Sequence, residues 1–189
     1  MTRRDTTRGP ARLPGDGSHA DMVEAMIRVD HAGEYGAVRI YEGQLAVLGD
    51  SAARPLLEEM AAEERRHLKT FDDLIGDRQV RPTALLPLWH VAGFALGAAT
   101  ALMGEKAAHA CTVAVEEAID EHYAEQVERL ERDGGEDDLR DTFEQFRQDE
   151  LRHKETAIEH GAEQAPGYDV LKGAIKTGSK LAILISTRI

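Results

Sequence analysis

The sequence is poor in several of the residue types from which common sites and scaffolds are built. It contains a single cysteine, Cys111, which excludes an internal disulfide framework, a four-cysteine zinc site and a rubredoxin-type iron centre. Lys and Arg number 23 against 35 Asp and Glu, and the net charge of -12 leaves no surplus of positive charge for binding nucleic acid. No stretch alternates apolar and polar residues over six positions, so strand signals are absent as well.

What remains is enough for one packed helical domain. A hydrophobic share of 42% over 189 residues can form a core, whereas a mean hydropathy of -0.42 is too low for a multispanning membrane protein. Residues 1–20 are rich in Arg, Gly, Pro and Thr and lack an apolar run, so we expect a disordered arm before a single domain over 21–189.

Glycines at positions 49, 76, 104, 134 and 161 divide the remaining sequence into segments of helical period. The fold class is therefore expected to be all-α, with helices long enough for a bundle. The expected helices cover residues 21–48, 52–75, 83–103, 105–132, 136–160 and 168–187.

An internal repeat relates the first two expected helices to the fourth and fifth. The motif acid-Glu-x-Arg-His occurs at positions 63–67 and again at positions 149–153. A glutamate followed seven residues later by a tyrosine occurs at positions 34–41 and again at positions 116–123. The sequence thus indicates a duplicated helical hairpin, joined through the third helix.

The repeated glutamates and histidines fall on the apolar faces of their helices, at about 100° per residue. Glu64 and His67, for example, share a stripe with Leu57 and Phe71 that contains no Lys or Arg. Burying an unpaired carboxylate costs on the order of several kcal/mol, so cations must neutralise these groups. Two divalent metals would cancel four carboxylates, and mixed carboxylate and imidazole ligands favour iron or manganese. The predicted ligands are Glu34, Glu64, His67, Glu116, Glu150 and His153.

Other polar residues lie near these stripes. Tyr41, Tyr123 and His122 are candidates for supporting catalysis from beside the metal, although the two tyrosines are also explained as core aromatics. Three acidic neighbours stand one residue from a ligand and are expected to lie at the edge of the stripe, where substitution should leave metal and activity largely intact. These neighbours are Glu63, Glu117 and Asp149.

From residue 24 onward the chain closely resembles the demethoxyubiquinone hydroxylases of ubiquinone biosynthesis, through the motifs RVDHAGEYGA, RPTALLPLW, GFALGA and TVAVEE. The resemblance implies a ferritin-like four-helix bundle with a crossover hydrophobic helix and an extra amphipathic C-terminal helix. It places the family's ligand set on the same six residues and implies two iron ions per chain. It also implies that O₂ hydroxylates the ring of a polyprenyl demethoxy-benzoquinone or quinol. The chain has no G-x-G-x-x-G fingerprint, so the reductant is external, either NADH acting at the quinone or a separate reductase.

Two apolar segments indicate a membrane surface. Residues 84–104 are apolar for 21 positions, long enough in principle to cross a bilayer, but a single crossing would separate the ligand helices. Residues 170–189 carry only Lys172, Lys176, Lys180 and Arg188 as charges, which suits an anionic lipid surface. We expect a peripheral protein on the cytoplasmic side of a bacterial cell membrane. The alternative is that these helices contact a second copy of the chain or other ubiquinone-biosynthesis proteins.

The alternative function is a membrane-associated di-iron ferroxidase or peroxidase of the ferritin-like class. An iron-storage bundle, however, does not need an apolar third helix and a basic amphipathic tail. A rubrerythrin-like peroxidase normally adds a cysteine-rich iron domain, which one cysteine cannot build.

Overall fold

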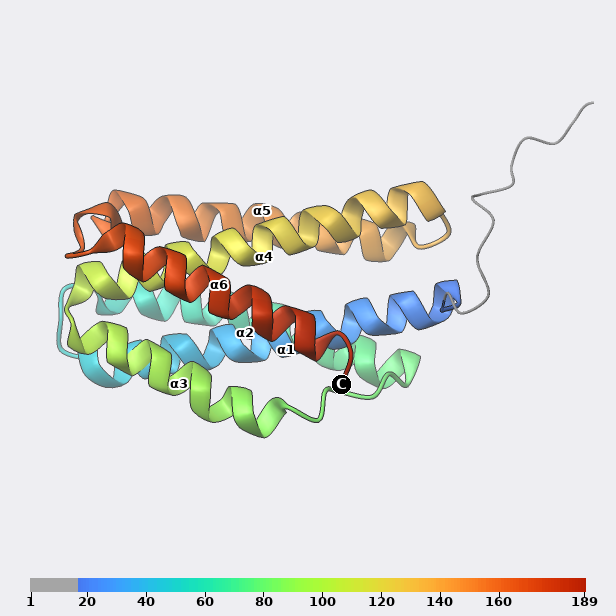
Figure 1. The fold of residues 1–189 in the computed structure, drawn as a ribbon, viewed down its shortest axis with the longest axis horizontal. Helices are drawn as coiled ribbons and strands as arrows, with labels where there is room; N and C mark the ends of the chain where they lie inside the picture. The colour runs from blue at the N-terminus through green and yellow to red at the C-terminus, as the bar shows by residue number, and fades with distance from the viewer. Residues whose placement is uncertain (1–16) are drawn as a thin grey trace, which may run out of the picture.

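The computed structural model describes residues 17–189, and within that range it contains helices and no strand (Figure 1). The all-α prediction is therefore confirmed. The six α-helices are α1 (His19–Leu48), α2 (Arg54–Arg78), α3 (Leu86–Leu102), α4 (Glu105–Asp133), α5 (Asp137–Glu159) and α6 (Tyr168–Ser186), with a short 3-10 helix η1 (Ala162–Gln164) before the last.

The helices pack as two hairpins with one additional helix on each. Helix α1 packs against α2 and α3, while α4 packs against α5 and α6. Helix α3 runs along α1 and connects the first hairpin to the second, and α6 crosses α4 in front of the bundle (Figure 1). The hairpins α1–α2 and α4–α5 are the two copies of the sequence repeat.

Two helix boundaries differ from the prediction for local reasons. Helix α1 begins inside the expected arm, because Ser18 and Asp21 form a capping box; residues 1–16 lie outside the described part of the chain. Gly76 was expected to end the second helix, but α2 continues to Arg78 and ends at Gln79, which has the left-handed φ of 53°. A glycine weakens a helix interior without breaking it.

The third helix is shorter than its apolar run. Helix α3 has 17 residues, with a proline in its first turn, and ends before Gly104, whose φ of 112° favours glycine. Across residues 17–189, no helix combines the length and the hydropathy that crossing a bilayer requires.

The core lies between the two hairpins. The predicted stripes are confirmed as its lining, with Leu57 and Phe71 of α2 and Phe143 of α5 fully buried. The thiol of Cys111 is also fully buried, and burial raises its pKa to about 12. In the middle of this apolar core stand buried carboxylates and histidines.

Candidate metal centre

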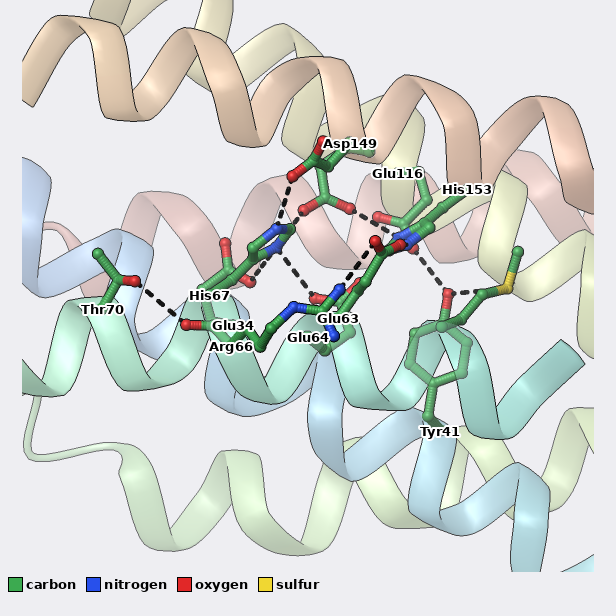
Figure 2. Close-up of polar contacts among 12 residues, drawn as sticks. Glu34, Tyr41, Glu63, Glu64, Arg66, His67, Thr70, Glu116, Asp149 and His153 are labelled. Atoms are coloured by element: carbon green, nitrogen blue, oxygen red, sulfur yellow. Dashed lines mark hydrogen bonds and ion pairs between the residues drawn. The ribbon is translucent and has the colours of Figure 1, made fainter. Parts of the chain in front are cut away.

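The six predicted ligands converge from four helices onto one point of the core. All are buried, with exposed fractions of 3% or less. Figure 2 shows the side chains of α1 and α2 facing those of α4 and α5. They are Glu34 of α1, Glu64 and His67 of α2, Glu116 of α4, and Glu150 and His153 of α5.

Their ligand atoms form two overlapping groups of four. In one group, Glu34 and His67 join Glu64 and Glu150; in the other, Glu116 and His153 join the same two glutamates. The ligand atoms of each group lie within 4.8 Å of one another. Glu64 and Glu150 belong to both groups, and each group of four could hold a metal ion.

Several buried atoms of the cluster have no partner outside it within residues 17–189. The oxygens of Glu64 and Glu150 meet Nδ1 of the two histidines, with His67 Nδ1 at 3.2 Å from Glu150 and His153 Nδ1 at 3.0 Å from Glu64. One oxygen each of Glu34 and Glu116 is likewise left without a partner outside the cluster. These atoms point at one another, and their mixture of carboxylate oxygen and imidazole nitrogen fits iron or manganese.

The electrostatics of the cluster also require positive charge. Burial by itself lowers the pKa of His67, but Glu150 and Glu34 raise it to about 11; the corresponding Nδ1–Oε distances are 3.2 and 3.6 Å. Burial likewise opposes the protonation of His153, whose pKa Glu150 and Glu64 raise to about 12. Burial and the charge of Glu150 raise the pKa of Glu64 well above its usual range. Positive charge, from protons or from metal ions that displace them, therefore stabilises the buried carboxylates.

Two carboxylates that the sequence analysis placed at the edge of the stripe hold the outer nitrogens of the histidines. Nε2 of His67 lies 3.1 Å from Asp149, and Nε2 of His153 lies 2.7 Å from Glu63, so each hairpin orients the histidine of the other (Figure 2). A carboxylate on the far nitrogen fixes the tautomer and orientation of a ligand histidine. The expectation that Glu63 and Asp149 are dispensable is therefore revised. The signal was present in the repeat, since both occupy the first position of acid-Glu-x-Arg-His.

The arginine of each repeat motif forms an ion pair with the first acidic residue of the same motif. Arg66 Nη2 donates to Glu63 at 2.9 Å, and Arg152 Nη2 lies 2.5 Å from Asp149. Glu117, the third acidic neighbour, faces the outside of the bundle instead. There it pairs with Lys172 at 3.3 Å.

Each of the two candidate tyrosines also contacts a predicted ligand on the opposite hairpin. Tyr41 of α1 donates to Glu116 of α4 at 3.2 Å, and Tyr123 of α4 donates to Glu34 of α1 at 2.5 Å. Burial raises the pKa of both hydroxyls, so each remains a proton donor to its glutamate. The hydroxyls thus contact the predicted ligands directly.

The third candidate, His122, is placed differently. Its Nε2 lies 3.2 Å from Asp30 and 3.0 Å from Gln126, and its side chain is partly exposed. Asp30 is buried and stands one helical turn before Glu34 on α1. His122 therefore belongs to a polar group beside the cluster and, unlike the tyrosines, reaches a predicted ligand only through Asp30.

An apolar cavity of about 470 Å³ lies between α1, α3, α4 and α6. Its lining includes Ala37 and Ile119, each of which follows a predicted ligand glutamate by about one helical turn, although none of the six predicted ligands lines it. Neither the cavity nor its position was predicted from the sequence.

Comparisons with known proteins agree with this geometry. The family model described as "Ubiquinone biosynthesis protein COQ7" matches residues 21–186. A 3-demethoxyubiquinol 3-hydroxylase of Rhodospirillum rubrum is 58% identical over 181 residues, covering 94% of this chain and 84% of the relative. A mitochondrial NADPH-dependent 3-demethoxyubiquinone 3-hydroxylase of Rattus norvegicus is 50% identical over 175 residues, covering 92% and 81%. A mitochondrial 5-demethoxyubiquinone hydroxylase of Saccharomyces cerevisiae is 41% identical over 187 residues, covering 91% and 80%. The chain belongs to the COQ7 family of ubiquinone biosynthesis proteins.

Proposed function

We propose that this chain, a 3-demethoxyubiquinol 3-hydroxylase, uses two iron ions to add a hydroxyl group from O₂ to the ring of a prenylated quinol. The observation that carries the proposal is the pair of four-residue groups sharing Glu64 and Glu150, together with an apolar cavity, in a chain of the COQ7 family. Two iron(II) ions would supply the electrons and the O₂-binding positions that ring hydroxylation needs.

The residues of the cluster have separate tasks in this proposal. Glu34 and His67 would hold one ion, Glu116 and His153 would hold the other, and Glu64 and Glu150 would be available to both. Asp149 and Glu63 keep the histidines oriented through their outer nitrogens, which preserves the metal geometry during turnover. Burial keeps water away from the reacting ring.

The tyrosines and His122 support the reaction from the side. Tyr41 and Tyr123 donate to one oxygen of Glu116 and Glu34, which leaves the other oxygen of each carboxylate to face the metal. His122, through Asp30, keeps a polar connection between the Glu34 side of the cluster and the partly exposed surface of α4.

The cavity is proposed as the entry for the prenylated quinol. Its walls are apolar except for two serines, which suits a prenyl chain, and its lining on α1 and α4 includes neighbours of the predicted ligands Glu34 and Glu116. Large apolar side chains next to it remain exposed, including Leu88 and Val91 of α3 and Leu181 and Leu184 of α6. This exposed face is proposed to rest on a lipid surface, from which the substrate would enter.

The basic residues of the C-terminal helix contribute to this arrangement differently from the expectation. Lys172 and Lys176 pair with Glu117, and Lys176 and Lys180 pair with Glu121, at 2.5 to 3.3 Å. These lysines attach α6 to α4, and this pairing occupies the charges expected to face anionic lipid. The membrane proposal therefore rests on the apolar face rather than on the lysines.

The remaining assignments follow from the family and stay proposals. The fold is proposed to be ferritin-like, with a di-iron domain that begins at α1; the arm expected over 1–20 overlaps α1 at His19, and its residues 1–16 lie outside the described part of the chain. The location is the cytoplasmic face of a bacterial cell membrane, where a second copy of the chain or other ubiquinone-biosynthesis proteins can meet it. The reductant is a nicotinamide donor, NADH in our proposal; the Rattus relative is named NADPH-dependent.

Single turnover tests the proposed function. Protein loaded with iron(II) is mixed with a short-chain demethoxy-quinol and ¹⁸O₂, and the products are analysed by mass spectrometry. We expect one ¹⁸O atom in the ring hydroxyl. Rapid iron oxidation with an unchanged quinol would identify a ferroxidase instead, and both reactions should be compared with NADH and NADPH as donors.

A further inference from the structure

Two groups of helical glycines in this chain differ in what an added Cβ atom would meet. At Gly43 of α1 and Gly97 of α3, the Cβ would overlap backbone atoms of the facing helix, at Phe94 and Ile40 respectively. These glycines allow α1 and α3 to approach closely. Packing alone explains them.

Gly33 and Gly36 of α1 and Gly178 of α6 belong to the other class. A Cβ at any of the three meets no heavy atom of the described chain within 4 Å, and all three line the cavity. Glycine makes a helix less stable than alanine does, so neither packing nor folding accounts for these positions. They cost stability and leave space.

The space belongs to the apolar cavity that is proposed to receive the quinol. Gly33 and Gly36 stand one residue before and two residues after Glu34 in the sequence, and Gly178 lines the same cavity from α6. We propose that Gly33, Gly36 and Gly178 are specificity-determining positions, whose missing side chains leave room for the ring and the first part of the prenyl chain of the quinol. The inference deepens the proposed function and rests on it for the identity of the substrate.

The chain provides an optical readout that does not require turnover. Trp89 is the one tryptophan in the sequence, and it lines this cavity. A quinone bound in the cavity would lie close to the indole and quench its fluorescence. Titration of the full-length protein with a short-chain prenylated demethoxy-quinone therefore measures binding separately from hydroxylation.

The test is a graded series, Gly36→Ala and Gly36→Leu, together with Gly178→Leu. Alanine and leucine are better helix formers than glycine, so the melting temperature should stay the same or rise. Because the added side chains fill the cavity, we expect the leucine variants to weaken quinone binding by about tenfold or more, with alanine in between. In steady state, KM for the quinol should rise more than kcat falls, and iron content should not change.

Gly173→Leu is the matched control. Gly173 is an exposed glycine of α6 with open space around it, but it does not line the cavity. It should bind and turn over quinone as the unsubstituted chain does. Gly43→Ala, in contrast, should lower the melting temperature through overlap with α3.

Two results would overturn the inference while leaving the proposed function intact. One is unchanged quinone binding and KM in folded Gly36→Leu and Gly178→Leu; the other is hydroxylation without any quenching of Trp89. If the series weakens quenching as expected but the unsubstituted, iron-loaded chain forms no hydroxylated product, then the proposed function fails and the binding inference stands.

Discussion

The two halves of the cluster carry the same ligands but different neighbours. Beside Glu34, the buried Asp30 accepts a hydrogen bond from Gln126 at 3.0 Å and lies 3.2 Å from His122. At the corresponding place beside Glu116 stands Thr112, an uncharged residue whose hydroxyl donates to the backbone oxygen of Ala108 at 3.5 Å.

The tyrosines and glutamines show the same divergence. The hydroxyl of Tyr41 also contacts the sulfur of Met60 at 3.6 Å, and Gln44 donates to the backbone of Ala108. Duplication thus explains the ligands, whereas the neighbours differ: the half around Glu34 has a buried carboxyl, Asp30, where the half around Glu116 has Thr112. Two metal ions bound here should therefore differ in environment, and the predictions below test this difference.

The largest expected effect separates the shared glutamates from the others. Glu64→Gln or Glu150→Gln should abolish hydroxylation and lower iron content in both halves, because each residue belongs to both ligand groups. Glu34→Gln and Glu116→Gln should each reduce binding mainly in one half. Iron per chain and Mössbauer spectra measure this, with Glu117→Gln as the control. A full complement of iron in Glu64→Gln would contradict the shared site.

The next effect concerns the acids on the histidines. Asp149→Asn and Glu63→Gln should each lower iron affinity by about 10- to 100-fold, because the histidine loses its orienting carboxylate. Competition with a chelator gives the affinity. If the histidines are oriented crosswise, Asp149→Asn should disturb the Glu34 half and Glu63→Gln the Glu116 half; the opposite pattern would show that each acid serves its own hairpin.

A smaller effect is expected at the tyrosines. Tyr123→Phe should slow hydroxylation more than Tyr41→Phe, because the Tyr41 hydroxyl is shared between Glu116 and the sulfur of Met60, whereas the Tyr123 hydroxyl donates to Glu34. Single-turnover rates at equal iron loading give the comparison. Equal rates in the two variants would mean that the two halves respond alike.

The smallest expected effect concerns Asp30, the buried carboxyl beside Glu34. Asp30→Asn removes a buried carboxyl whose pKa burial raises, while the bond from Gln126 can rearrange to the new amide. We expect the Mössbauer parameters of one iron to shift, with iron content unchanged. A matching change at Thr112, Thr112→Val, should leave the spectrum as it was.

Much of this site followed from the sequence because helical period and burial are local properties. The stripes around Glu64 and Glu150 placed the predicted ligands in the core before any helix was positioned. The roles of Glu63 and Asp149 did not follow, because each contacts a histidine on the opposite hairpin. Their place one residue from a ligand predicted a position at the edge of the buried stripe. The packing of α2 against α5 brings each of these acids to the histidine ring of the opposite helix.

Features that depend on how separate helices meet were missed in the same way. The lysines of α6 were expected to be available to lipid. However, α6 lies along α4, where Glu117 and Glu121 of α4 pair with them. The cavity could not be predicted either, because its walls come from four separate helices. The length of the third helix was overestimated for a different reason: the apolar run covers 84–104, but α3 has only 17 residues, because apolar composition does not determine where a helix begins and ends.

The state of Cys111 has a practical consequence. Its thiol is fully buried and its pKa is raised to about 12, so at neutral pH it is protonated and inaccessible to reagents. A cysteine introduced at Leu102, which is 76% exposed on α3, would then be the sole reactive thiol of the chain. Spin labels or fluorophores can therefore be attached to the exposed apolar face while the natural cysteine stays in place.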